Sequence, residues 1–255
     1  MEFALQFGHG MMKNCLALVK QWGGGSVILS PRDLKAEQMV KFSRDINGSG
    51  ALTLLDPQLY VPDCDHARLT NHSFWPQVPE YWRNPAELQR VMRELVRLNV
   101  DVRTSLVISP SPLISVITED ALEAVDTSVQ ELARIGVRGE QVFATVALAS
   151  DAVRNEDRAE LLSDAIESWD VAGIYLVAEH PSSEYLVTDP MWLARLLDIV
   201  AGARLAGKQV MVGYCTHQML IAATAGANII ASGTWMNVRS FSPKKFDEVD
   251  EDEIK

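Results

Sequence analysis

The sequence lacks the features that mark secreted and membrane-spanning proteins. It has only three cysteines, and Cys15, Cys64 and Cys215 form no C-x-x-C pair, which agrees with a reducing compartment. No apolar run approaches the roughly 18 residues of a membrane span, and the N-terminal MEFALQFGHG lacks the basic residues of a signal peptide. We therefore expect a cytoplasmic protein without a membrane partner.

Positive charge is also scarce. The chain has 23 Lys and Arg residues against 34 Asp and Glu residues, which gives a formal net charge of −11. This balance excludes the broad basic surface of a general nucleic-acid-binding protein. A local basic groove around Arg32, Arg68, Arg83 and Arg239 stays open.

No linker rich in Pro, Gly or Ser divides the 255 residues, and 47% of them are hydrophobic. This length is close to the roughly 250 residues of one (β/α)8 barrel. The glycine-rich stretch Gly23–Ser26 precedes a predicted strand, whereas a phosphate-binding loop follows one, so we interpret it as a turn. We predict a single domain over residues 1–255, with a long loop at 60–84 and an acidic tail at 243–255.

Short apolar and β-branched runs recur along the chain and are mostly followed by helical patterns. The runs are Phe3–Phe7, Ser26–Leu29, Ala51–Leu55, Val100–Ile108, Gln141–Ala149, Ala172–Ala178, Gln209–Val212 and Ala227–Ala231. The predicted helices are Met12–Trp22, Lys35–Ile46, Asn84–Leu98, Thr118–Ile135, Asn155–Trp169, Asp189–Leu205 and Gln218–Ala225. Eight strands alternating with helices predict an α/β fold, the (β/α)8 TIM barrel.

The eighth helix of this barrel is weak or missing. After the last run comes only SFSPKKFDEVDEDEIK, in which Phe246, Val249 and Ile254 form a thin apolar stripe. An uncovered barrel flank would expose a large apolar patch. We therefore expect either a homodimer or a C-terminal region beyond Lys255 to cover strand eight.

Active sites of such barrels lie at the C-terminal ends of the strands. Asp56 directly follows the third run, and Glu179 follows the sixth. We predict that these two carboxylates are catalytic and share one cavity with His9 and Tyr214. In the alternative, Asp56 only caps the turn to Pro57.

Other strand-end residues suit substrate binding. Gln58 can offer both a donor and an acceptor to a purine edge, and Arg239 follows Gly233–Thr234, a segment suited to phosphate. Arg32 and Asp33 are equally well explained as a local ion pair. The predicted substrate-binding residues are His9, Arg32, Asp33, Gln58, His180, Tyr214, His217, Thr234 and Arg239.

Metal ligands are too few for a site. Cys215 and His217 flank Thr216, but structural and catalytic zinc sites need three or four ligands. We predict no metal site and no cofactor within this chain.

The segment VMVGYCTHQMLIAATAGANIIASGTWMNVRSF (Val210–Phe241) resembles the strand-seven to strand-eight region of tRNA-guanine transglycosylases. The matching positions are Gly213, Thr216, Leu220 and Gly226.

Two further segments resemble the same superfamily. AGIYLVAE (Ala172–Glu179) is similar to the family's GGLAVGE stretch, with Glu179 on its glutamate, and LLDPQLY (Leu54–Tyr60) falls where the family has D-S-G-G-F-Q, with Asp56 on the aspartate. The FGHG, SPRDL and DPQLY blocks look most like the branch that modifies DNA with deazapurines.

This resemblance implies an enzyme that exchanges a guanine or 7-deazaguanine-type base in DNA or tRNA, with nucleic acid or a nucleotide as partner. Asp56 would handle the base, and Glu179 would assist as the second carboxylate. The family's nucleophilic aspartate aligns with Ala231, which cannot attack. Its zinc cluster has no counterpart up to Lys255, so a zinc subdomain would require a longer natural protein.

Two other functions stay open. One is a TIM-barrel lyase or aldolase that acts on a small phosphorylated or carbonyl metabolite, although the candidate Schiff-base lysines lie on predicted helices or just before the seventh run: Lys13, Lys35, Lys41 and Lys208. The other is a catalytically inactive base-binding barrel, which Ala231 suggests.

Overall fold

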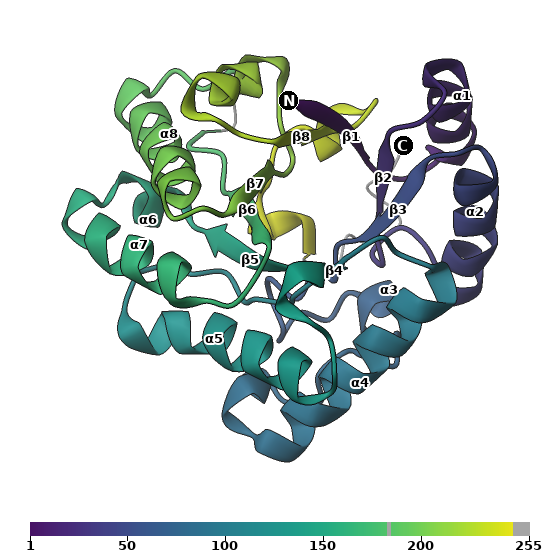
Figure 1. The fold of residues 1–255 in the computed structure, drawn as a ribbon, viewed down its shortest axis with the longest axis horizontal. Helices are drawn as coiled ribbons and strands as arrows, with labels where there is room; N and C mark the ends of the chain where they lie inside the picture. The colour runs from purple at the N-terminus through teal and green to yellow at the C-terminus, as the bar shows by residue number, and fades with distance from the viewer. Residues whose placement is uncertain (183–184, 247–255) are drawn as a thin grey trace.

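Eight parallel strands curve into a barrel with the helices outside it (Figure 1). The computed structural model describes residues 1–182 and 185–246. The strand order is β3-β2-β1-β8-β7-β6-β5-β4, and between β3 and β4 the Ser105 N–H donates to the Thr53 carbonyl at 3.0 Å. The predicted (β/α)8 TIM barrel is confirmed. Its strands are β1 (Glu2–Gln6), β2 (Ser26–Leu29), β3 (Leu52–Leu55), β4 (Val107–Ile108), β5 (Val142–Leu148), β6 (Gly173–Ala178), β7 (Gln209–Val212) and β8 (Ile229–Ser232).

The helices surround this barrel. The α-helices are α1 (Met12–Trp22), α2 (Ala36–Gly48), α3 (Ala67–Thr70), α4 (Pro85–Val102), α5 (Glu119–Arg134), α6 (Ser150–Arg154), α7 (Ala159–Ser168) and α8 (Pro190–Leu205). The 3-10 helices are η1 (Tyr81–Arg83), η2 (Gly139–Gln141), η3 (Glu156–Arg158), η4 (His217–Ala225), η5 (Met236–Val238) and η6 (Pro243–Phe246).

Side-chain caps fix where two long helices begin. The Asn84 side chain accepts from two backbone N–H groups at the start of α4, and Asp189 does the same at the start of α8. Both are followed by proline, whose fixed φ suits the first helical turn. In α8 this cap also sets the position of Trp192, one of the two residues whose N–H groups Asp189 binds.

Three predicted elements differ from the structure. The run Val100–Ile108 is strand only at Val107–Ile108, because α4 continues to Val102 and ends at Arg103, which takes the left-handed φ of 54°. The predicted helix Asn155–Trp169 begins as η3 and continues as α7, after the separate helix α6. The seventh helix consists of 3-10 turns.

The long loop at 60–84 contains the short helices α3 and η1. Phe74, Trp75 and Tyr81 are buried, and Arg90 of α4 donates to the carbonyls of Ser73 and Trp75 at 2.6 and 2.7 Å. These aromatic residues therefore form part of the core beneath the loop. The single-domain boundaries stay a prediction.

The segment after β8 turns into the barrel mouth and does not cover the flank of strand eight (Figure 1). Its helix η6 ends at Phe246, which is 2% exposed. The rest of the predicted tail, with Val249 and Ile254, lies outside the described residues. The predicted homodimer stays a prediction. No helix in residues 1–182 and 185–246 is long and apolar enough to cross a membrane.

We predict that Gly213→Ala destabilises the protein by about 1–3 kcal/mol, because a side chain there overpacks the barrel. Gly213 follows β7, and a Cβ atom at this position would lie 2.6 Å from the Tyr175 hydroxyl. Gly48→Ala is the matched control, because a Cβ atom there meets nothing within 4 Å and Gly48 is the last residue of α2. Urea unfolding measures both. Equal stability of the two variants would contradict the packing argument.

Candidate functional site

Asp56 lies at the C-terminal end of β3 and is completely buried. Its Oδ1 accepts from the Tyr60 hydroxyl at 2.8 Å and from the Gln58 backbone N–H at 3.0 Å. Its Oδ2 accepts from the hydroxyls of Tyr214 at 2.9 Å and Tyr175 at 3.2 Å. The carboxyl is thus enclosed by three tyrosines that come from different elements around the barrel.

Burial raises the pKa of Asp56 to about 6, although the hydrogen bonds from Tyr60, Tyr214, Gln58 and Tyr175 act in the opposite direction. The loss of hydration outweighs these bonds because they come from neutral groups. Burial also holds the pKa values of all three tyrosines well above their usual value. At neutral pH the site therefore has three protonated phenols around a carboxyl that can gain or lose a proton.

Gln58 and Tyr214 both have left-handed backbone conformations, with φ of 57° and 53°. The Gln58 Nε2 donates to the Tyr214 hydroxyl at 3.0 Å, so the two strained residues support each other. Such conformations cost about 1–3 kcal/mol each and persist only where the surrounding structure enforces them. They commonly occur at functional sites, which is why this pair marks the Asp56 region as a candidate.

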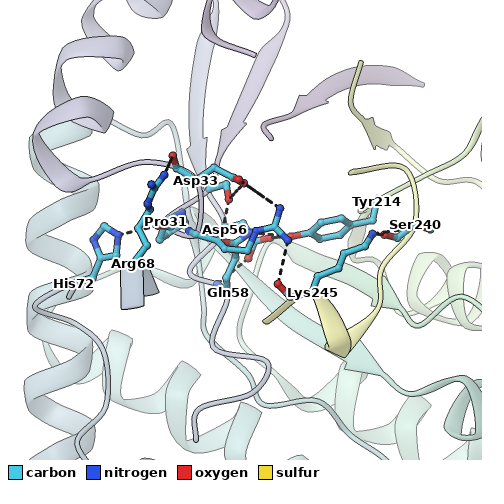
Figure 2. Close-up of polar contacts among 11 residues, drawn as sticks. Pro31, Asp33, Asp56, Gln58, Arg68, His72, Tyr214, Ser240 and Lys245 are labelled. Carbon is cyan, nitrogen blue, oxygen red and sulfur yellow. Dashed lines mark hydrogen bonds and ion pairs between the residues drawn. The ribbon is translucent and has the colours of Figure 1, made fainter. Parts of the chain in front are cut away.

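A second polar layer holds Gln58 in place (Figure 2). The Gln58 Oε1 accepts from the Arg32 backbone N–H at 2.9 Å and from the Ser30 hydroxyl at 3.1 Å. The Ser30 hydroxyl shares its single proton between Gln58 and Asp33, whose Oδ2 lies closer at 2.7 Å, and Arg32 pairs with Asp33 at 3.4 Å. The predicted local ion pair between Arg32 and Asp33 is present. It helps to hold the turn whose Ser30 hydroxyl and Arg32 N–H bind Gln58.

Two side chains of the loop at 60–84 bind the backbone of the turn that contains Ser30, Arg32 and Asp33. Arg68 donates to the Asp33 carbonyl at 2.6 Å, and the His72 Nε2 lies 3.0 Å from the Pro31 carbonyl oxygen. Figure 2 shows both side chains reaching the same turn after β2. Arg68 and His72 therefore position the site, whereas Tyr60, at the start of the same loop, lines it.

The C-terminal segment covers the tyrosines. Phe241 lies 4.9 Å from the Tyr60 ring and 5.5 Å from the Tyr214 ring between centroids, and Phe246 lies 5.5 Å from Tyr60. The His180 N–H donates to the Phe241 carbonyl at 3.0 Å. This cover explains why Asp56 has no exposed surface.

The same segment brings a lysine to the barrel mouth. Lys245 donates to the Ser240 carbonyl, and Arg32 donates to the Lys245 carbonyl at 3.3 Å. Burial, with a contribution from the Arg32 charge, lowers the pKa of Lys245 to about 8. Lys245 was not a predicted site residue, because its place in the barrel mouth depends on the C-terminal segment turning back.

The structure brings together only part of the predicted site. Asp56, Gln58 and Tyr214 are in contact, but the Glu179 carboxylate accepts from the Ser150 N–H at 3.1 Å, and His9 is exposed. Asp56 and Glu179 follow β3 and β6 at the same end of the barrel, and the cavity expected for Asp56, Glu179, His9 and Tyr214 stays a prediction. The sequence could not show this partner of Glu179, because Ser150 follows the neighbouring strand β5 and lies 29 residues away along the chain.

The remaining predicted residues lie near β6 to β8. The His180 Nδ1 lies 2.8 Å from the Ser182 carbonyl oxygen, and the His217 Nδ1 lies 3.2 Å from the Tyr185 hydroxyl. Arg239 donates to the Gly233 carbonyl at 2.8 Å and to the Thr234 carbonyl at 3.5 Å. No residue of this group contacts Asp56 directly.

Tyr60 and Tyr175 were not among the predicted site residues. Tyr175 lies inside the apolar run of β6 and is fully buried. A buried tyrosine hydroxyl requires a partner, so a tyrosine in the middle of a barrel strand was the available signal. Within residues 1–182 and 185–246 no group of three or more His, Cys, Asp or Glu side chains could hold a metal ion.

No family model matches the sequence, and no curated protein matches it. Solved structures do share the fold at low identity. An HpcH/HpaI aldolase/citrate lyase family protein from Burkholderia cenocepacia J2315 is 14% identical with a TM-score of 0.52, over 91% of this chain and 87% of that one. An HpcH/HpaI aldolase from Desulfitobacterium hafniense DCB-2 is 12% identical with a TM-score of 0.51, over 91% and 85%.

A third similar structure comes from Burkholderia cenocepacia J2315 and is provisionally assigned as a phosphonomutase. It is 12% identical with a TM-score of 0.50, over 91% of this chain and 86% of that one. Identities this low establish the barrel fold alone.

The resemblance to tRNA-guanine transglycosylases is wrong. The three similar structures named above are described as an aldolase/citrate lyase family protein, an aldolase and a provisional phosphonomutase, so the predicted base exchange, the 7-deazaguanine substrate and the glycosyltransferase activity are withdrawn. The site agrees with this correction, because Asp56 is fully buried beneath aromatic side chains and does not face an open surface for a nucleic-acid strand.

We predict that Asp56 makes the protein less stable as the pH rises. In the unfolded chain this carboxyl ionises near 3.8, whereas the folded protein keeps its proton up to about 6. The folded state binds more protons in this interval, so the free energy of unfolding falls as the pH rises through it, by about 3 kcal/mol.

Urea unfolding at pH 4 and pH 7.5 measures this effect. In Asp56→Asn the free energy of unfolding should fall by about 3 kcal/mol less between these two pH values than in the wild type. Asp63→Asn, which changes an exposed carboxylate in the connection after β3, should behave like the wild type. Equal losses in the wild type and in Asp56→Asn would show that the carboxyl has an ordinary pKa.

Proposed function

We propose that this chain is a lyase- or aldolase-like enzyme that moves a proton on a small carbonyl metabolite, with Asp56 as the acid–base group. The observation that carries the proposal is a buried carboxyl with a pKa of about 6 enclosed by three tyrosine hydroxyls. The Asp56 carboxyl lies at the C-terminal end of the strands, where active sites of this fold lie. The likeness to barrels described as aldolases and citrate lyases supports the same class.

The pKa of Asp56 suits both halves of a proton transfer. A general acid–base group works best when its pKa is close to the pH at which it operates. The carboxylate form takes a proton from the carbon next to a carbonyl, and the acid form returns it. Asp56 at about 6 has both forms available near neutral pH.

The tyrosines supply the second requirement of this chemistry. Removing a proton next to a carbonyl places negative charge on the carbonyl oxygen, and fixed hydrogen-bond donors stabilise that charge. Tyr60, Tyr175 and Tyr214 keep their phenolic protons because burial raises their pKa values. When a substrate oxygen replaces one carboxyl contact, a phenol donates to that oxygen.

Access to this site requires movement of the C-terminal segment. Phe241 and Phe246 are 1% and 2% exposed and pack on Tyr60. A substrate therefore cannot reach Asp56 while this segment is in place. We infer that the substrate enters when the segment from Ser240 to Phe246 lifts away from the tyrosines.

Deuterium exchange into small 2-oxo acids tests the proposal. The wild type, incubated with pyruvate, 2-oxobutyrate and oxaloacetate in D2O, should exchange the protons next to the carbonyl of at least one of them, as followed by proton NMR. Asp56→Asn removes the base and should lower that rate at least about 100-fold.

Asp63→Asn is the matched control, because it removes an exposed carboxylate from the same loop and should leave the rate unchanged. An Asp56→Asn variant that exchanges at the wild-type rate would contradict the role of Asp56. A folded wild type that exchanges none of the three acids would overturn the proposed function and leave the tyrosine network as a structural core.

A further inference from the structure

A small cavity lies at the C-terminal ends of β6 and β7, and Tyr214 is part of its wall whereas Asp56 is not. The cavity has a volume of about 20 Å³, and its walls include His180, Trp192, Thr216, Arg239 and Phe241 as well as Tyr214. A space of this size holds one oxygen-sized group. The Tyr214 hydroxyl donates to Asp56, so a single side chain separates the cavity from the acid–base carboxyl.

Three residues that line this cavity each have a buried polar side-chain atom with no hydrogen-bond partner among the described residues. These atoms are Trp192 Nε1, Thr216 Oγ1 and His180 Nε2. Trp192 and Thr216 are 3% and 2% exposed, so water outside the protein does not reach them. A buried polar group without a partner costs about 1–3 kcal/mol, and three such groups at one cavity call for a shared ligand.

The chemistry of these atoms favours a ligand that accepts hydrogen bonds. The indole N–H can only donate, and the threonine hydroxyl can donate as well. The His180 Nδ1 lies 2.8 Å from the Ser182 carbonyl oxygen, and a carbonyl only accepts. The Ser182 N–H donates to the same Nδ1 at 3.4 Å, so these contacts do not fix the tautomer, and the two donors of Trp192 and Thr216 decide which ligand fits.

Arg239 adds a positive charge to the same wall. Its guanidinium donates to the Gly233 carbonyl and to the Tyr185 hydroxyl, at 2.8 and 3.2 Å. Within the part of the chain that the structure describes, it forms no ion pair with a carboxylate. A guanidinium on the wall of a small cavity favours an anionic ligand there.

We propose that this cavity is the subsite for the carboxylate of a 2-oxo acid, held by Trp192, Thr216 and Arg239. This inference rests on the proposed function and names its substrate class. One carboxylate oxygen fits the cavity, whereas the four oxygens of a phosphate group do not. Because Tyr214 stands between this subsite and Asp56, the carbonyl oxygen of the bound acid reaches Asp56 only when it replaces Asp56 as the acceptor of the Tyr214 hydroxyl and that side chain moves.

Phe241 connects the two halves of the site. It lines the cavity and also packs against Tyr214. Binding a 2-oxo acid therefore displaces the segment that covers Asp56. The carboxylate subsite is reached first, because its wall includes Ser240 and Arg239, which are only partly buried.

The Trp192 indole gives a site-specific readout of binding. In a 15N-labelled protein, its Nε1–H resonance is assigned by its loss in Trp192→Phe. Pyruvate should shift this resonance downfield as the N–H gains a carboxylate acceptor. Methyl pyruvate, which has the same carbonyl but no charge, should leave it in place.

Two conservative variants test the contacts. Trp192→Phe and Thr216→Val keep shape while removing one donor each, and each should weaken pyruvate binding about tenfold. Trp169→Phe is the matched control: Trp169 is equally buried but precedes β6, at the opposite end of the barrel, and its loss should leave the affinity unchanged.

A Trp192 resonance that stays unmoved by tens of millimolar pyruvate or oxalate would overturn the inference, and the three polar atoms would then bind an ordered water only. Unchanged affinity in both variants would overturn it as well. The outcome is separate from that of the proposed function, because loss of deuterium exchange in Asp56→Asn would stand even if Trp192 did not respond.

Discussion

The structure depends on a carboxyl group buried in the barrel without a cation beside it. Asp56 forms no ion pair among the described residues and relies on neutral donors, from Tyr60, Tyr175, Tyr214 and the Gln58 backbone. Neutral hydrogen bonds do not repay the lost hydration of a charge. The pKa consequently rises to about 6, and the group becomes able to exchange a proton near neutral pH.

Other features follow from holding this carboxyl in place. Gln58 and Tyr214 have strained, left-handed backbone conformations. Gly213 has no side chain, which leaves room for the Tyr175 ring. Phe241 then excludes water above the tyrosines while forming part of the wall of the neighbouring cavity. The acid–base group and the inferred carboxylate subsite thus share Tyr214 as their boundary and Phe241 as their cover.

The sequence predicted the barrel well because strand and helix periodicity is local. Asp56 was found as a candidate because it directly follows the apolar run of β3, and Gln58 and Tyr214 because they follow strands. Lys245 and the covering role of Phe241 could not be found this way, since they depend on the C-terminal segment turning back into the mouth. The transglycosylase interpretation failed because a few matched residues in a common fold carry little information about chemistry.

The central claim is that the proton of Asp56 is the one transferred in the reaction. The most direct test is to titrate the 13C-labelled Asp56 carboxyl by NMR and to measure the pH dependence of deuterium exchange into a 2-oxo acid with the same protein. We expect one rising limb in the rate with a midpoint near 6, and we expect it to coincide with the NMR midpoint. A rate whose midpoint differs clearly from that of Asp56 would contradict the account.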